Sequence, residues 1–154
     1  MRRLNLANNE LTGTIPRSWG KLTSLAHLSL FANKLSGAMP IEIGEMKSLT
    51  NLDLSKNKIT GTVPPSLGKL SRAQWLVLGE NQLTGAIPPE LGGLTALTRF
   101  LNLANNELSG PSQQFLCRSV NTCLPAGTQN IAIRILIRYR GIHIQVRYLR
   151  LWAS

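Results

Sequence analysis

The chain has 154 residues and a formal net charge of +10, and 43% of its residues are hydrophobic but only 5% aromatic. This length suits one domain, and its core must be built mainly from leucine, isoleucine and valine. No apolar run reaches the roughly 20 residues that cross a bilayer, and the polar start Met1-Arg2-Arg3 lacks the apolar stretch of a secretory signal. We therefore expect neither a membrane span nor a signal peptide in this chain, and its compartment stays open.

One repeat, with a spacing of 24, dominates the chain between Leu4 and Gly110. It begins at Leu4, Leu28, Leu52 and Leu76, and once more at Leu101 after a spacing of 25. Other columns keep the same spacing, among them the asparagines Asn9, Asn33, Asn57, Asn81 and Asn106 and the glycines Gly13, Gly37, Gly61, Gly85 and Gly110. Such a period indicates stacked coils, because one coil cannot bury its own apolar edge.

The third repeat shows what each column does. Leu52 and Leu54 alternate with polar residues, which is the period of a strand with one buried face. The amide of Asn57 can donate and accept, so we expect the asparagines to point inward as a ladder that satisfies backbone groups of adjacent rungs. Gly61 permits a backbone conformation closed to other residues, and residues 66–70 predict a short helical turn. Each coil is thus a strand, a bend, a second extended piece and a short turn.

The pattern Leu-x-x-Leu-x-Leu-x-x-Asn-x-Leu-Thr/Ser-Gly-x-Ile-Pro-x-x-Leu-Gly-x-Leu resembles the plant-specific class of leucine-rich repeats. That class occurs in receptor-like kinase ectodomains, receptor-like proteins and polygalacturonase-inhibiting proteins. The resemblance implies an α/β repeat: a right-handed solenoid with a short-stranded parallel sheet on the concave face and short helical turns elsewhere. It also implies recognition of a protein or peptide and an extracellular or cell-surface location. Since the family's N-terminal cap is missing, we expect the chain to be a fragment of a longer receptor-like sequence.

Two departures from the repeat carry local predictions. Trp19 takes a column otherwise filled by aliphatic residues, so we assign it to the core. One extra residue precedes Leu101, which predicts a small bulge at Phe100. We place the repeat domain at residues 1–111, with about five repeats, and an atypical arginine-rich tail at residues 112–154.

The tail carries six arginines and no acidic residue or lysine. Cys117 and Cys123 could close a small disulfide loop or stay as free thiols. Two β-branched runs around Arg140-Gly141 predict a strand pair. The arginines could form a face that binds phosphates, lipid head groups or nucleic acid, or the segment could be a misframed end without a function.

Catalytic and metal-binding patterns are not evident. His27, Ser29 and Asp53 would lie near each other on adjacent strands, but nothing supplies an oxyanion pocket for a nucleophilic reaction. Two histidines 116 positions apart and one cysteine pair do not make a metal-ligand set. Neither a phosphate-binding glycine loop nor a kinase motif occurs. We expect a protein that is not an enzyme and binds no cofactor and no metal, although the parent gene could still encode a receptor kinase.

The outward strand positions predict a binding surface on the concave face. The partner-binding candidates are His27, Ser29, Phe31, Asn51, Asp53, Ser55, Trp75, Val77 and Phe100. Exposed aromatics in a polar field are typical of interface hot spots, although Phe31 and Trp75 could instead shield neighbouring rungs. The leading hypothesis is a non-catalytic domain that binds a protein or peptide. The alternatives are polyanion or membrane-surface binding through the tail, and a fragment without a function of its own; we do not expect the repeats to bind nucleic acid.

Overall fold

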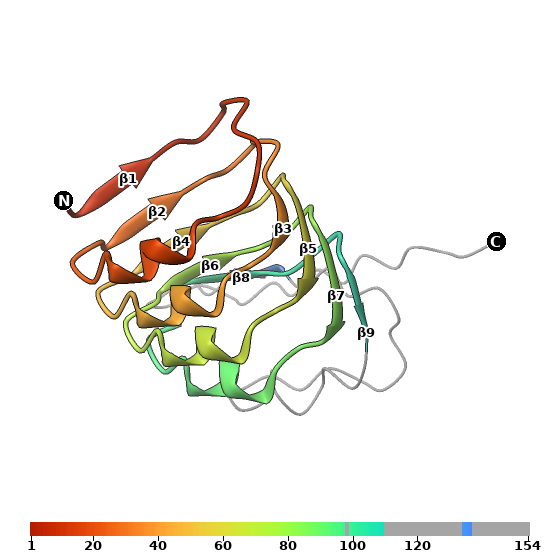
Figure 1. Cartoon of the computed structure of the whole chain (residues 1–154). Helices are drawn as coiled ribbons and strands as arrows, with labels where there is room; N and C mark the ends of the chain where they lie inside the picture. Colours follow the sequence, from red (N-terminus) through yellow and green to blue (C-terminus); the bar gives the residue numbers. More distant parts are fainter. Residues whose placement is uncertain (98, 110–133, 137–154) are drawn as a thin grey trace.

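The computed structural model describes residues 1–97 and 99–109 and the backbone of residues 134–136. Each coil contributes one strand to the first sheet, and the chain then turns (Figure 1). Most coils add a second strand to another sheet, and a short 3-10 helix leads to the next coil. This arrangement is the predicted solenoid of stacked coils, and it follows from the alternation of apolar and polar residues in every repeat.

The first sheet is the one that the sequence predicts. Its strands run in the order β1, β2, β4, β6, β8 and β10, and the first five are parallel. Leu28, Leu52 and Leu76 lie opposite one another, so the register of the sheet equals the 24-residue repeat. The bounds are β1 Arg3–Asn5, β2 His27–Ser29, β4 Asn51–Asp53, β6 Trp75–Val77, β8 Phe100–Asn102 and β10 Arg134–Leu136.

The second extended pieces form a sheet of their own, which the sequence analysis did not predict. The strands are β3 Ser36–Ala38, β5 Lys58–Thr62, β7 Gln82–Ala86 and β9 Glu107–Ser109, and they are parallel. Gly37 pairs with Ile59 and Gly61 with Leu83, so the step in residue number is 22 here and not 24. Paired residues on neighbouring strands are therefore 22 positions apart at these pairs of the second sheet and 24 positions apart from β2 to β6 in the first. Gly61 has a φ of +76°, as expected for a residue that needs the left-handed region.

The short turns are 3-10 helices that stack on one another (Figure 1). Each one follows a proline in extended conformation, such as Pro64, because proline fixes φ and ends the preceding strand. A methyl group added at Gly44 would overlap the carbonyl of Ser66 in the next turn, so glycine is required for this spacing. The bounds are η1 Arg17–Lys21, η2 Ile41–Glu45, η3 Pro65–Lys69 and η4 Pro89–Gly93.

The core lies between the two sheets and the 3-10 turns and is aliphatic. Leu52, Leu54 and Leu76 are at most 1% exposed, and Trp19 is partly buried and packs against the core, as predicted. The two central asparagines Asn33 and Asn57 are 9% exposed. Asn33 and Asn57 therefore belong to the interior of the solenoid, whereas the prediction that Asn9 points inward is wrong, because it is exposed on the first coil.

The asparagine ladder has the predicted connections between rungs. The Asn57 amide nitrogen donates to the carbonyls of Leu30 in the previous rung and Leu54 in its own rung, at 2.9 and 3.0 Å. Its Oδ1 accepts the backbone N–H of Leu35 at 3.1 Å. Asn33, Asn81 and Asn106 repeat this pattern of donors to two rungs. Asn9 is exposed and bonds only within its own turn.

The residue before each ladder asparagine has a positive φ, which the sequence analysis did not predict. These residues are Asn8, Ala32, Lys56, Glu80 and Asn105, with φ between 53° and 55°. Only the two asparagines belong to a residue type that favours this region. The bend after the first sheet is thus held by the ladder and not by the preference of the residue that makes it.

The predicted bulge at Phe100 is wrong. Phe100 lies opposite Trp75 in regular register, and the N–H groups of Arg99 and Phe100 share the carbonyl of Gln74, as the equivalent pairs do in earlier rungs. The extra residue of this repeat therefore leaves the pairing of β8 with β6 regular.

The tail is described only at β10, which pairs antiparallel with β8. The cysteine pair, the predicted strand pair around Arg140-Gly141 and the boundary at residue 111 lie outside the described residues. In the described part of the chain no helix is long and apolar enough to cross a membrane.

Candidate functional site

The outward side chains of the first sheet form two columns that cross the strands. The first column contains Arg3, His27, Asn51, Trp75 and Phe100. The second contains Asn5, Ser29, Asp53, Val77 and Asn102. Seven of the nine predicted candidates lie in these columns; Phe31 and Ser55 follow the strands and are treated below.

Trp75 is the most exposed large apolar group on this sheet. It is 38% exposed, and its ring centroid lies 5.5 Å from that of Phe100 with the planes tilted by 45°. Tilted aromatic pairs at this distance attract each other, so Phe100 restrains the indole from one side. Asn51 occupies the same column on the other side. The column therefore presents a braced aromatic surface next to a polar one.

The second column is partly used to close the strand ends. Asn5 and Asn102 accept the backbone N–H of the residue two positions later, at 3.0 and 2.9 Å. Asp53 accepts both the N–H and the hydroxyl of Ser55 on Oδ1, at 3.0 and 2.6 Å. Such Asx turns satisfy backbone groups where the strands of the first sheet end, so these side-chain oxygens stabilise the bend that follows.

The prediction that Ser55 projects toward a partner is wrong. Ser55 is only 6% exposed, and its hydroxyl donates to Asp53. Strand β4 ends at Asp53, so the alternation that would turn Ser55 outward no longer applies there.

Phe31 lies beside a basic side chain rather than in the two columns. The Lys56 ammonium is 5.5 Å from the Phe31 ring centroid, a cation–π distance. The same ammonium is 4.0 Å from a carboxylate oxygen of Glu80. These three residues come from three successive rungs, and only the 24-residue register could have indicated their proximity.

The three residues with a superficial likeness to a catalytic triad do not form one. Ser29 lies opposite Asp53 on neighbouring strands, but the Asp53 Oδ1 is held by Ser55. No side-chain hydrogen bond joins His27, Ser29 and Asp53 to one another, and all three are described. Within residues 1–97 and 99–109, no group of three or more His, Cys, Asp or Glu residues is placed to hold a metal ion.

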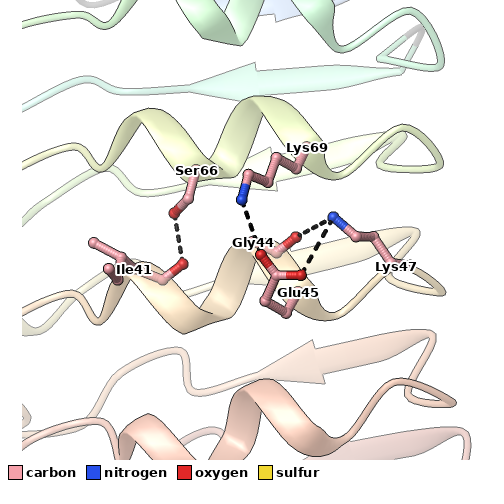
Figure 2. Close-up of polar contacts among 6 residues, drawn as sticks. All are labelled: Ile41, Gly44, Glu45, Lys47, Ser66 and Lys69. Carbon is pink, nitrogen blue, oxygen red and sulfur yellow. Dashed lines mark hydrogen bonds and ion pairs between the residues drawn. The ribbon is translucent and has the colours of Figure 1, made fainter.

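A second polar cluster lies on the layer of 3-10 turns (Figure 2). Glu45 is 3.0 Å from the Lys69 ammonium and 3.7 Å from that of Lys47. The hydrogen bond from Lys69 and the charge of Lys47 lower the pKa of the Glu45 carboxyl below its ordinary value. Lys47 also donates to the carbonyl of Gly44 at 3.0 Å. This cluster was not among the predicted sites.

Comparison with known proteins identifies the repeat. One family model described as "Leucine rich repeat" matches residues 46–109, and a second of the same description matches residues 1–22. No curated protein matches the chain significantly. The chain is 38% identical to the ectodomain of the Arabidopsis thaliana receptor kinase GASSHO1/SCHENGEN3, solved in complex with CASPARIAN STRIP INTEGRITY FACTOR 2, with a TM-score of 0.75. That match covers 77% of this chain and 14% of the receptor.

Two further solved structures show that this fold serves different ligands. The Arabidopsis receptor kinase HAESA, in complex with the peptide hormone IDA and the co-receptor SERK1, is 39% identical over 70% of this chain and 18% of its own, with a TM-score of 0.67. A plant ice-binding protein is 36% identical over 70% of this chain and 35% of its own, with a TM-score of 0.66. The fold therefore does not decide the ligand. The chain spans about a seventh of the GASSHO1 ectodomain and less than a fifth of HAESA. With its 24-residue period and these matches, the chain belongs to the plant-type leucine-rich-repeat family.

Proposed function

We propose that the chain binds a protein or peptide, without catalysis, through the outward columns of the first sheet. The observation that carries the proposal is Trp75, a tryptophan 38% exposed in the middle of a regular sheet and braced by Phe100. Its strand neighbour Leu76 is fully buried, so the indole cannot also enter the core. A large rigid side chain of this kind buries much area against a partner and loses little conformational entropy.

The surroundings of Trp75 favour an extended peptide that crosses the strands. The columns run from His27 through Asn51 to Trp75, so polar groups lie next to the aromatic pair in a line. A ligand with an apolar side chain over the indole could therefore place backbone or polar groups over Asn51 and His27. HAESA, which is similar in fold and sequence, was solved in complex with a peptide hormone. We extend that class of ligand to the rungs of this chain.

The test compares Trp75→Ala with Ile41→Ala. Peptides that bind the wild-type chain are selected from a synthetic library and titrated by calorimetry. Trp75→Ala should weaken binding by about 2 kcal/mol or more, which is roughly thirtyfold. Ile41 is 65% exposed but lies on the 3-10 layer, so Ile41→Ala should leave the affinity unchanged. Circular dichroism of both variants checks that the fold is intact.

A third variant separates this proposal from binding through the tail. Arg138→Ala combined with Arg140→Ala should leave peptide binding nearly unchanged, because the proposed surface consists of the columns that run from Arg3 to Asn102. If this double variant abolished binding while Trp75→Ala had no effect, the proposed surface would be wrong.

A further inference from the structure

A groove lies between the first and second coils, where residues 14–17 lead into η1 and residues 38–42 lead from β3 into η2. It has a volume of about 490 Å³. No backbone hydrogen bond joins these two segments, so the coils are free to separate here. The lining residues Ile15 and Met39 are buried and form the floor, whereas Ile41 is 65% exposed and forms part of the rim. The groove therefore offers apolar surface to a ligand.

Glu42 brings an unsatisfied carboxylate to this groove. Its Oε2 is buried and has no hydrogen-bond partner among the described residues. In the next coil the same column holds Ser66, whose hydroxyl donates to the carbonyl of Ile41 at 2.6 Å (Figure 2). An ionised carboxylate can only accept, so Glu42 cannot make the equivalent bond to the carbonyl of Arg17. Because a buried acceptor without a donor is costly, this oxygen favours a ligand that supplies a donor.

The Glu42 side chain is also free to meet such a ligand. The residue as a whole is only partly buried, and within residues 1–97 and 99–109 its side chain forms neither an ion pair nor a hydrogen bond. By contrast, Glu10, Glu45 and Glu80 each pair with a lysine. A rotation of the Glu42 carboxylate toward the groove therefore breaks no polar contact.

Arg17 supplies the opposite charge at the same groove. It is exposed, and its side chain forms no ion pair or hydrogen bond, with Glu42 or with any other group, in the part of the chain that the structure describes. The guanidinium fork can donate to a carbonyl or carboxylate oxygen. An unused donor, an unused acceptor and an exposed apolar side chain therefore line one groove.

We propose that this groove binds the N-terminal residue of a peptide whose first side chain is apolar. In this arrangement the α-ammonium group donates to Glu42, the first carbonyl oxygen accepts from Arg17, and the side chain packs against Ile41 and the floor. A free peptide N-terminus carries these three groups within a few bonds of one another. The groove shares no residue with the columns of the first sheet, so this activity is separate from the proposed function.

Other ligands satisfy only part of the groove. An anion such as phosphate could pair with Arg17, but Glu42 would repel it. A lysine side chain could pair with Glu42 but brings no acceptor for Arg17. A metal ion needs several oxygen ligands, and the groove has one carboxylate. A free amino acid carries the right groups, but a peptide gains further contacts along an open groove and should bind more tightly.

The experiment titrates the isotope-labelled full chain with the tripeptide Leu-Gly-Gly amide and follows the backbone amide signals by NMR. The shifts should be largest in residues 14–17 and 38–42. Acetylation of the tripeptide's N-terminus removes its positive charge and should weaken binding about tenfold. Ser-Gly-Gly amide, which keeps the charge but lacks the apolar side chain, should bind about fivefold more weakly.

Two pairs of variants test the residues of the groove. Glu42→Gln should weaken binding of the tripeptide about tenfold. Glu90→Gln makes the same change in net charge at an exposed residue of the same column, and it should change the affinity by less than about twofold. Ile41→Ala should weaken binding about fivefold, whereas Trp75→Ala should leave it unchanged. Thermal unfolding of each variant establishes that it is folded.

Several outcomes would overturn the inference. Equal affinities of the free and acetylated tripeptides would mean that no ammonium group is recognised, and equal losses in Glu42→Gln and Glu90→Gln would mean that net charge acts instead. Free leucine that binds as tightly as the tripeptide would make the ligand an amino acid. Loss of binding in Trp75→Ala would place the tripeptide on the first sheet. Absence of binding at about 10 mM tripeptide would reject the site, and it would leave the proposed function of the first sheet untouched.

Discussion

Replacing Asn57 with leucine tests whether the asparagine ladder holds the rungs together. The side chain bridges two rungs, because it donates to Leu30 of the second and Leu54 of the third and accepts the N–H of Leu35. Leucine has nearly the same size but no polar atom. The substitution therefore removes these hydrogen bonds in a site that is 9% exposed and leaves the Leu35 N–H without a partner. The carbonyls of Leu30 and Leu54 each keep one donor, the amides of Asn33 and Asn81.

The expected loss of stability follows from these groups. A buried polar group without a partner costs about 1 to 3 kcal/mol, and each lost hydrogen bond to a carbonyl that keeps another donor costs about 1 kcal/mol. One N–H and two carbonyls therefore cost on the order of 4 kcal/mol together. The leucine side chain offsets about 2 kcal/mol of this through apolar burial. We therefore expect Asn57→Leu to lower the free energy of unfolding by about 2 kcal/mol, although it makes the core more hydrophobic.

Asn9→Leu is the matched control in the same column. Asn9 is exposed and donates only to Leu6 and Ala7 in its own turn, where water can replace it. This variant should lose less than about 1 kcal/mol. Urea unfolding followed by circular dichroism gives both values, and hydrogen exchange should show the Asn57→Leu loss at the Leu35 amide. Equal losses at the two positions, or an unchanged exchange rate at Leu35, would refute the ladder argument.

Two further predictions concern the 3-10 layer. Gly68→Ala should destabilise the chain by about 1 to 3 kcal/mol, because the added methyl would overlap the backbone carbonyl of Glu90. Gly93→Ala, whose methyl would lie 3.4 Å from its nearest neighbour, should change the thermal midpoint very little. Lys69→Met should raise the pKa of Glu45 toward its ordinary value, as measured by NMR titration, because Lys69 is the main cause of the lowered pKa. The small stabilisation from this pair is present at neutral pH and disappears as the pH falls through the lowered pKa, so an unchanged Glu45 titration would contradict the assignment.

The parts of the fold that recur in every repeat could be predicted from the sequence. Leu52 and Leu76 occupy equivalent places and lie opposite each other in the sheet, since the constant 24-residue spacing makes equivalent residues neighbours. The same reasoning placed Asn57 inside the solenoid. In each of these cases the periodicity alone determines which residues are neighbours.

The parts that depend on the end of a strand could not be predicted in this way. Ser55 was assigned outward by alternation, but the strand ends two residues earlier, and Ser55 is buried with its hydroxyl donating to Asp53. The positive φ at Lys56 has no signal in the residue type, because the ladder asparagine after it imposes the bend. The second sheet was missed because its register, which pairs Gly37 with Ile59, differs from the spacing of the repeat. These features are set by hydrogen bonds between rungs, which no single repeat contains.

The columns of the repeat differ in how strongly the fold constrains them, and this difference explains how such a chain can acquire a ligand without losing its fold. The leucine, asparagine and glycine columns are fixed by burial, by hydrogen bonds to two rungs and by close approach of the 3-10 turns, so substitution there costs stability. The first outward column is free of these constraints, and this is where the chain departs from regularity. Trp75 occupies a column whose other members include Asn51 and His27. A residue that breaks its column without a structural reason is therefore a better guide to binding than one that keeps it, and this is the basis on which the proposed peptide-binding surface rests.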